Sequence, residues 1–159
     1  MNEEKIENIV SRLLIEKKYT VATAESCTGG MIASTLINYP GISEVFLEGA
    51  VTYSNEAKHK RLGVKNETLD AYGAVSEETA QEMAIGVTKM AQSNVGIVTT
   101  GIAGPGGGTE EKPVGLVYIG VCVNGDVNVE KHIFEGDRMQ VRKSATFTAL
   151  SMLLNKLKI

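Results

Sequence analysis

The sequence has little of what marks a secreted, disulfide-bonded or membrane protein. Its 159 residues include only two cysteines, Cys27 and Cys122, which lie far apart without Cys-x-x-Cys spacing and so indicate no disulfide framework. No apolar run reaches the ~20 residues that cross a bilayer, and the N-terminus lacks the basic and apolar segments of a signal peptide. We therefore expect a cytoplasmic protein with free thiols and no membrane partner.

Positive charge and histidine are scarce as well. The 16 Lys and Arg residues are outnumbered by 19 Asp and Glu, and the net charge of -3 provides no basic field to attract a nucleic acid backbone. His59 and His132 are the only histidines, and neither has a second metal ligand at a suitable spacing. We expect no nucleic acid partner and no metal site.

The composition that remains is that of one packed domain. With 43% hydrophobic residues, 22% charged residues and three prolines, the chain is too apolar to be mainly disordered. Its length falls within the usual range of a single domain, and no repeat, low-complexity tract or linker divides it. We expect one domain over residues 1–159.

Apolar periodicity predicts helices and strands that alternate along the chain, with helix caps at Ser54, Ser76 and Asp137, the last in a capping box with Gln140. The continuous apolar run over 95–100 is typical of a strand buried on both faces, whereas the turn Asn124-Gly125-Asp126 predicts an antiparallel hairpin. The sheet must therefore be mixed, and we predict an α/β fold, a single three-layer α/β/α domain with a mixed β-sheet. The predicted helices cover 5–18, 31–38, 55–61, 66–72, 77–92 and 138–156, and the predicted strands cover 19–23, 45–53, 95–100, 114–123 and 127–134.

Three segments contain more small and polar residues than packing requires, namely 24–30, 52–58 and 100–115. Each lies at the end of a predicted strand. Ligands of open α/β sheets bind in the crevice beyond the strand ends, where loops and helix N-termini converge. We therefore predict that the three segments meet there and form the functional site.

Ser26 is the candidate nucleophile of the first segment. It lies in a strand-turn-helix junction before Gly29 and Gly30, where a hydroxyl can be exposed while backbone N–H groups point toward an oxyanion. The junction differs from the Gly-x-Ser-x-Gly elbow, because Ala24 and Thr28 occupy the glycine positions. The segment alone favours the simpler interpretation of Ser26 as a helix N-cap.

Two neighbours of Ser26 are candidates for a chemical role. Cys27 is a competing nucleophile if a helix N-terminus lowers the pKa of its thiol, although the lack of a nearby histidine favours a buried, inert cysteine. Glu25 could be an acid, a base or a local hydrogen-bonding group, and the sequence does not decide among these roles.

Lys58 is the candidate base of the second segment. It lies within two turns of Tyr53 on a helix that Ser54 caps, and a lysine held near a serine can be its general base when desolvation or a nearby cation lowers its pKa. Taken alone, Lys58 is a surface lysine, since Lys60 and Arg61 beside it form an ordinary basic helix face.

Glycines dominate the third segment. Successive unhindered N–H groups in GIAGPGGGT (101–109) can surround an anion, but the order matches neither the P-loop nor Gly-x-Gly-x-x-Gly. A flexible surface loop explains this composition equally well. Lys112, Arg138 and Arg142 are candidate cationic partners for a phosphate, although arginines on the last helix are more often solvated.

Six ordered motifs together resemble one known family. They are TAESCTGG (23–30), FLEGAVTYSNEAK (46–58), LGV (62–64), GAVS (73–76), TGIAGPGGGTEEKPVG (100–115) and FEGDRMQVR (134–142). Over nearly its whole length the chain resembles the nicotinamide-nucleotide amidase family, also called the CinA C-terminal domain or competence-damage-inducible protein family. Six motifs in one order make this resemblance far more specific than any single segment.

The resemblance implies hydrolysis of the carboxamide of nicotinamide mononucleotide to nicotinate mononucleotide and ammonia, a step of pyridine nucleotide salvage that needs no metal or organic cofactor. The family's proposed nucleophile matches Ser26, its proposed lysine base matches Lys58, and the tyrosine of its YSN motif matches Tyr53. Longer relatives carry an additional N-terminal domain that resembles molybdopterin-cofactor-binding proteins, and we expect this chain to lack it.

The mechanism that this resemblance implies is acyl transfer. Ser26 attacks the amide carbon, Lys58 takes its proton and delivers it to the departing ammonia, and water cleaves the acyl-enzyme. We expect the N–H groups after Ser26 to hold the oxyanion, and the glycine loop with an arginine to hold the ribose phosphate. The expected substrate-binding residues are Thr28, Gly29, Gly30, Thr100, Gly101, Gly104, Gly106, Arg138 and Arg142.

Two functions of other classes stay open. The chain could be a nucleotide-binding sensor without turnover, or a protein-interaction module linked to competence or DNA damage. Assembly into a homo-oligomer is open as well, because nothing in the sequence fixes the number of subunits.

Overall fold

The computed structural model describes residues 3–159 and contains a mixed sheet. Its strands are β1 (Val21–Glu25), β2 (Phe46–Val51), β3 (Val95–Gly101), β4 (Leu116–Val123) and β5 (Asp126–Ile133), in the spatial order β2-β1-β3-β4-β5. β1 pairs in parallel with both β2 and β3, whereas β4 is antiparallel to both of its neighbours. The predicted mixed sheet and its hairpin are confirmed.

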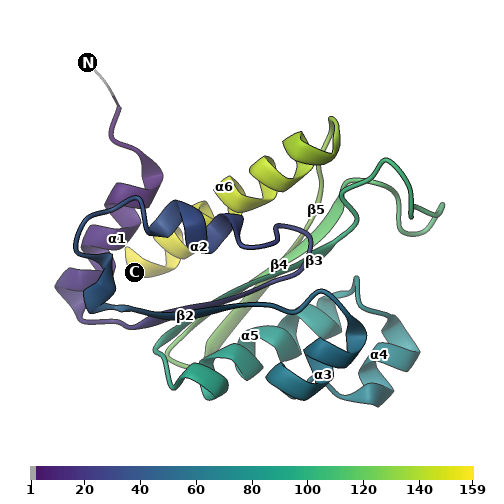
Figure 1. The fold of residues 1–159 in the computed structure, drawn as a ribbon, viewed down its shortest axis with the longest axis horizontal. Helices are drawn as coiled ribbons and strands as arrows, with labels where there is room; N and C mark the ends of the chain where they lie inside the picture. Colours follow the sequence, from purple (N-terminus) through teal and green to yellow (C-terminus); the bar gives the residue numbers. More distant parts are fainter. Residues whose placement is uncertain (1–2) are drawn as a thin grey trace.

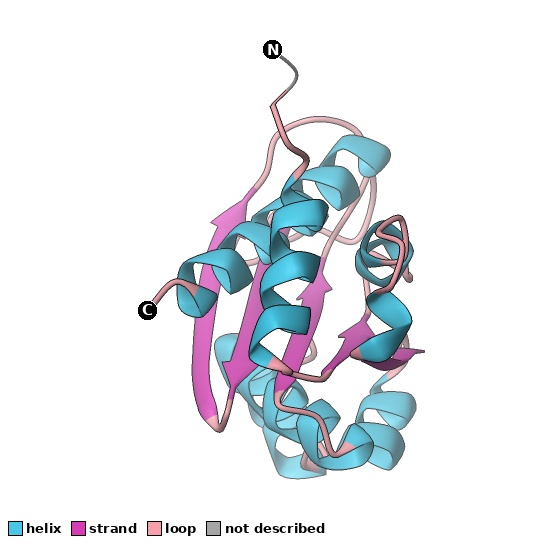
Figure 2. Cartoon of the chain, turned by 90° about the vertical axis from the view of Figure 1, so that its left-hand side faces the viewer, coloured by secondary structure: helices cyan, strands magenta, loops and turns pink. Residues whose placement is uncertain are grey.

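Helices cover both faces of this sheet (Figure 1). One face carries α1 (Ile6–Lys17), α2 (Met31–Leu36) and α6 (Arg138–Leu157), and the other carries α3 (Asn55–Leu62), α4 (Asn66–Tyr72) and α5 (Glu77–Ala91). The view in Figure 2 shows the strands between the two helical layers, which confirms the three-layer α/β/α prediction. Within residues 3–159, every helix is too short or too polar to cross a bilayer.

Each helical layer encloses its own half of the core. On one face, Leu14 of α1 and Leu153 of α6 are fully buried in one cluster with Ile97 of β3. On the other face, Met83 of α5 is buried in a second cluster with Val98 of β3. Strand β3 is thus covered on both sides, as its continuous apolar run predicts.

Three helices begin at the caps that the sequence predicts. Ser54 and Ser76 each accept a hydrogen bond from the backbone N–H three residues further on, and Asp137 with Gln140 forms the predicted capping box. These bonds satisfy N–H groups that a helix start leaves without partners. The cap at Ser54 also sets where α3 begins and therefore where Lys58 lies on it.

The first strand lies two residues further along the chain than the predicted 19–23. Lys18 ends α1 in the left-handed conformation, and the N–H of Tyr19 donates back to the carbonyl of Leu14 at 2.9 Å. Residues 18–20 therefore form the closing turn of the helix, and β1 ends at Glu25, directly before Ser26. The other predicted boundaries differ from the structure by at most two residues.

Gly86 lets α3 pack closely against α5. A Cβ at this position would collide with the carbonyl group of Leu62 at the end of α3, so a side chain would force the two helices apart. Their close contact fixes the helix that carries Lys58.

Candidate active site

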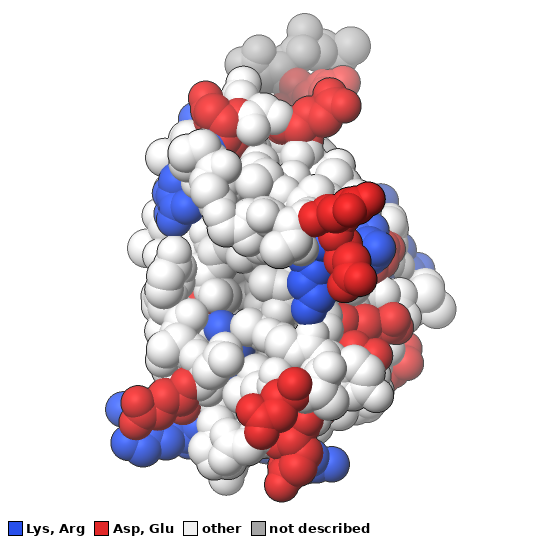
Figure 3. Space-filling view, turned by 90° about the vertical axis from the view of Figure 1, so that its right-hand side faces the viewer, with Lys and Arg blue, Asp and Glu red and all other residues white. Residues whose placement is uncertain are grey.

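A pocket of about 270 Å³ lies beyond the ends of β1, β2 and β3. Figure 3 looks onto this side of the molecule and shows a central hollow with Lys or Arg atoms inside it and acidic side chains around it. The pocket brings the three predicted segments together, which confirms that they converge. They contribute Ser26 and Cys27, then Tyr53 and Lys58, and then Thr100, Gly101, Ile102, Ala103, Gly104, Gly106 and Gly107.

Ser26 is held at the first position after β1. Its N–H donates to the carbonyl of Thr99 on β3 at 3.1 Å, and the residue is 8% exposed. The cap of α2 is Gly30, and no side chain caps that helix. The interpretation of Ser26 as a helix N-cap is therefore wrong, and its hydroxyl is free for another role.

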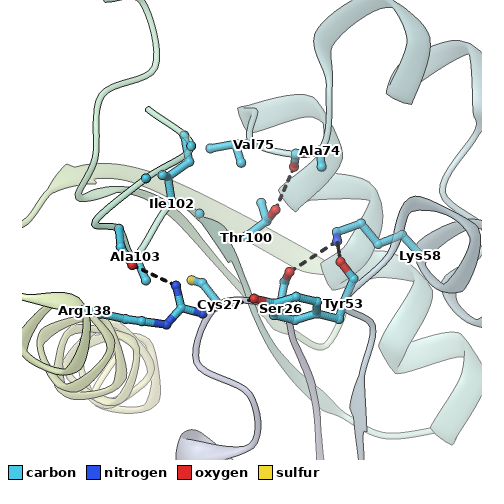
Figure 4. Close-up of a pocket in the computed structure, with 14 residues that line it drawn as sticks. Ser26, Cys27, Tyr53, Lys58, Ala74, Val75, Thr100, Ile102, Ala103 and Arg138 are labelled. Carbon is cyan, nitrogen blue, oxygen red and sulfur yellow. Dashed lines mark hydrogen bonds between the residues drawn. The ribbon is translucent and has the colours of Figure 1, made fainter. Parts of the chain in front are cut away.

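Lys58 reaches from α3 to the hydroxyl of Ser26 (Figure 4). Its Nζ donates to Ser26 Oγ at 3.3 Å and to the backbone carbonyls of Thr52 and Tyr53 at 2.9 and 3.3 Å. Lys58 is 1% exposed, and no carboxylate of residues 3–159 forms an ion pair with it. The interpretation of Lys58 as a surface lysine is wrong.

The burial of Lys58 changes its chemistry. Removing an ammonium from water disfavours its charged form, so desolvation lowers the pKa of Lys58 below its ordinary value. The nearby thiol of Cys27, when ionised, has a smaller and opposite effect. A lysine with a lowered pKa beside a hydroxyl is the arrangement that general base catalysis requires.

Cys27 lines the pocket but is a poor nucleophile. Burial, the largest influence, raises the pKa of its thiol to about 11, so the thiol is neutral near pH 7. The helix that was expected to activate it begins only at Met31. The structure thus supports the buried, inert cysteine, and Cys122 is also free and buried.

Glu25 is a buried acceptor for the first turn of α2. It is 1% exposed, and its carboxylate accepts from the N–H groups of Ile32 and Ala33 at 2.9 and 3.1 Å and from the hydroxyl of Thr28 at 2.6 Å. Glu25 does not line the pocket. Of the three roles that the sequence left open, the structure supports local hydrogen bonding.

Tyr53 and Arg138 approach each other across the pocket. Arg138 donates through Nη2 to the Tyr53 hydroxyl at 3.2 Å and through Nη1 to the carbonyl of Gly104 at 2.9 Å. Figure 4 shows the Tyr53 ring extending toward the arginine from the opposite side. Tyr53 touches Lys58 with its backbone carbonyl and not with its hydroxyl.

Four of the predicted binding residues lie outside the pocket lining. Arg142 donates to the carbonyls of Cys27 and Thr28 at 3.0 and 3.2 Å, and the side chain of Thr28 is fully buried. The N–H of Gly29 donates to the carbonyl of Ser26, while Gly30 is the cap of α2. These residues shape the turn around Ser26, and their role in binding stays a prediction.

The glycine loop forms the opposite wall. The loop is anchored where it begins, because Thr100, the residue before it, donates from its hydroxyl to the carbonyl of Ala74 at 2.7 Å. Further along, the N–H groups of Gly104, Gly106 and Gly107 have no acceptor among the described residues. Such free N–H groups suit an anion. Lys112, one of the predicted cations, instead donates to the carbonyl of Tyr72 at 2.6 Å.

Sequence reasoning missed several contributors to the site. Ala74 and Val75 line the pocket, yet their segment GAVS (73–76) was only one of the family motifs and was given no role in the site. Thr99 contacts the backbone of Ser26, and the only sequence signal for it is the pair of threonines that ends an apolar strand.

The charged groups of the pocket are cationic. Lys58 and Arg138 line it, and no Asp or Glu does. Within residues 3–159, no three or more His, Cys, Asp or Glu side chains are grouped so as to hold a metal ion. The pocket therefore combines a hydroxyl, a buried amine and an arginine, which suits a ligand with an anionic group.

A family profile and curated relatives match nearly the whole chain. A sequence profile described as the CinA C-terminal domain matches residues 3–157. A competence-damage inducible protein of Clostridium beijerinckii is 73% identical over 148 residues, which make up 93% of this chain and 36% of the relative. One from Clostridium perfringens is 64% identical over 156 residues, or 98% of this chain and 38% of the relative. The chain thus spans little more than a third of the length of these curated relatives.

Solved structures show the same fold over the full length of both chains. A CinA superfamily protein from Klebsiella pneumoniae has a TM-score of 0.94 at 35% identity and covers 99% of each chain. The competence/damage inducible protein from Agrobacterium tumefaciens has a TM-score of 0.89 at 41% identity, with coverage of 100% of this chain and 99% of that one. In sequence and in fold, this chain belongs to the CinA family of competence-damage inducible proteins.

Proposed function

We propose that the chain is a cytoplasmic amidase that hydrolyses the carboxamide of nicotinamide mononucleotide to nicotinate mononucleotide and ammonia. The observation that carries this proposal is the contact of 3.3 Å between Lys58 Nζ and Ser26 Oγ. Both residues line one pocket, and Lys58 is buried without a carboxylate partner among the described residues. A serine beside a lysine of lowered pKa is an activated nucleophile for acyl transfer.

In the first half of the reaction, the oxygen of Ser26 attacks the amide carbon while Lys58 accepts the hydroxyl proton. The backbone N–H groups after Ser26, beginning with Cys27 in the pocket wall, stabilise the negative charge that develops on the amide oxygen. The carbon–nitrogen bond then breaks as Lys58 returns the proton to the leaving nitrogen, which departs as ammonia. An ester between Ser26 and the nicotinate carbon remains.

The second half repeats these steps with water. Lys58 takes a proton from water as its oxygen attacks the ester carbon, and the proton passes to Ser26 Oγ as the ester bond breaks. Nicotinate mononucleotide leaves, and both side chains return to their starting states. One lysine therefore serves every proton transfer.

The rest of the substrate fits the cationic and glycine-rich wall. Free N–H groups of the loop and the guanidinium of Arg138 provide donors for a phosphate. The positive pyridinium ring near Lys58 favours the neutral form of the amine, which further lowers its pKa when the substrate binds. Binding of this substrate therefore helps to prepare the base.

Release of ammonia from nicotinamide mononucleotide by the purified chain tests the proposal. We expect equal amounts of ammonia and nicotinate mononucleotide, and loss of both with Ser26→Ala. Thermal stabilisation by nicotinamide mononucleotide without turnover would replace the amidase with a nucleotide sensor. Neither turnover nor stabilisation would favour an interaction module.

A further inference from the structure

A buried chain of hydrogen bonds runs behind the Ser26 turn, away from the pocket. The N–H of Ser26 lies 3.4 Å from the hydroxyl of Thr99, which lies 2.9 Å from the hydroxyl of Thr28. The Thr28 hydroxyl in turn lies 2.6 Å from the carboxylate of Glu25. All three side chains belong to residues that are at most 1% exposed, and none takes part in the proton transfers proposed above.

The carboxylate fixes the direction of this chain. Thr28 donates its single hydroxyl proton to the carboxylate of Glu25. The oxygen of Thr28 is then the acceptor for the proton of Thr99, and the oxygen of Thr99 is the acceptor for the N–H of Ser26. Each hydroxyl donates once and accepts once, and every bond is oriented toward Glu25.

The same carboxylate also holds the helix that follows the turn. Ile32 and Ala33 of α2 donate their N–H groups to the two carboxylate oxygens. Glu25 therefore joins the end of β1, the start of α2 and, through Thr28 and Thr99, the backbone of the nucleophile. Buried and fully paired networks of this kind restrict the conformations open to the groups that they hold.

We infer that Glu25, Thr28 and Thr99 are positioning residues that hold Ser26 in the orientation in which it reacts. Thr99 has the most direct part, because its carbonyl and its hydroxyl both lie against the N–H of Ser26. Loss of its hydroxyl leaves the Thr28 oxygen without its donor and the Ser26 turn with one restraint fewer. Small displacements of a nucleophile reduce rates strongly even when binding is unchanged.

Thr99→Val tests this inference because it removes the hydroxyl and keeps the shape, while Thr99→Ser keeps the hydroxyl. Thr23→Val is the matched control, since Thr23 on β1 is also fully buried but its hydroxyl has no hydrogen-bond partner within residues 3–159. Thr28→Val interrupts the same chain of hydrogen bonds one bond further from Ser26. It provides a second measurement if Thr99→Val does not fold.

Two rates are measured for each folded variant. One is turnover of nicotinamide mononucleotide, and this part rests on the proposed function. The other is covalent labelling of Ser26 by a fluorophosphonate, followed by intact mass, which requires a positioned nucleophile but no natural substrate. We expect Thr99→Val to lower kcat and the labelling rate each at least about tenfold, with KM within about twofold of wild type. Thr99→Ser and Thr23→Val should resemble the wild type in both rates.

The pH profile separates positioning from loss of the base. The pKa that limits turnover should be the same in Thr99→Val as in wild type, because Lys58 is unchanged. If folded Thr99→Val and Thr28→Val keep the wild-type kcat and labelling rate, the three hydrogen-bonded side chains only contribute to the packed core. That result would overturn the inference. Wild-type protein that is not labelled at Ser26 would overturn it too. Labelling without turnover of nicotinamide mononucleotide would refute the proposed substrate alone, and the variant labelling rates would then decide the inference.

Discussion

The two walls of the pocket differ in how their polar groups are used. On the Ser26 and Lys58 wall, the amine has three acceptors and the nucleophile's backbone is tied to β3. On the glycine wall, the N–H groups of Gly104, Gly106 and Gly107 have no acceptor among the described residues. Groups that are already oriented suit bond making and breaking, because no reorganisation is needed as charge develops. Free N–H groups suit the binding of a ligand that supplies the missing acceptors.

Substitutions in the wall formed by Ser26 and Lys58 should have the largest effect on turnover. Ser26→Ala and Lys58→Ala should each lower turnover of nicotinamide mononucleotide at least about a hundredfold. The double variant should be little worse than either single one, because the two side chains act as a unit. Steady-state kinetics of the three variants checks this.

Lys60→Ala is the matched control for this experiment. Lys60 lies on the same helix but is exposed and paired with Glu56, so its loss should leave kcat unchanged. Near-native turnover in Ser26→Ala, together with loss in Cys27→Ala, would replace the serine with a thiol despite the raised pKa of Cys27.

Loss of contacts to the glycine wall should weaken substrate binding and leave the reaction at Ser26 and Lys58 unchanged. Nicotinamide riboside lacks the phosphate and forfeits hydrogen bonds to charged groups that contribute about 1.5 to 3 kcal/mol each. Its kcat/KM should therefore fall by at least about tenfold relative to the mononucleotide. Arg138→Ala should reduce the preference for the mononucleotide over the riboside, since Arg138 is the only arginine that lines the pocket. Equal kcat/KM for the two substrates would remove the phosphate role from residues 101–109.

A smaller effect concerns the free energy of unfolding. Its dependence on pH should differ between variants of Lys58 on one wall and of Arg138 on the other. Burial lowers the pKa of Lys58 in the folded protein, whereas in the unfolded chain the pKa has its ordinary value of about 10.4. Below the folded pKa the buried ammonium destabilises the fold, and this penalty disappears as pH rises toward the unfolded value. The stability of wild type relative to Lys58→Met should therefore increase with pH in that window.

Urea unfolding at several pH values measures this difference. The Arg138→Met variant is the control, because an arginine stays charged throughout that range. A difference between wild type and Lys58→Met that does not change with pH would mean that Lys58 titrates alike in the folded and unfolded states.

Local signals in the sequence were enough to predict most of the fold. The caps at Ser76 and Asp137 and the turn at Asn124-Gly125-Asp126 act within a few residues, and each lies where the pattern places it. The first strand was displaced because the turn that ends α1 depends on a bond from Tyr19 back to Leu14, which leaves no compositional signal.

The candidate site was harder to predict because its contacts join distant segments. Composition alone made Ser26 a cap and Lys58 a surface lysine, and only the resemblance to a family paired them. Arg138 and Arg142 lie one helical turn apart and look alike in sequence. One lines the pocket and the other binds the carbonyls of Cys27 and Thr28, a difference that arises from the packing of α6 against the Ser26 turn.

The pH dependence of kcat with nicotinamide mononucleotide tests the central claim, that a neutral Lys58 activates Ser26, most directly. Wild type and Lys58→Ala are compared between about pH 6 and about pH 10, a range that extends to just below the ordinary lysine pKa. Because burial lowers the pKa of Lys58, the wild-type kcat should rise with pH and level off well below that ordinary value, and the residual rate of Lys58→Ala should be flat. A wild-type kcat that climbs steadily to the top of the range, or a rise that persists in Lys58→Ala, would contradict the account.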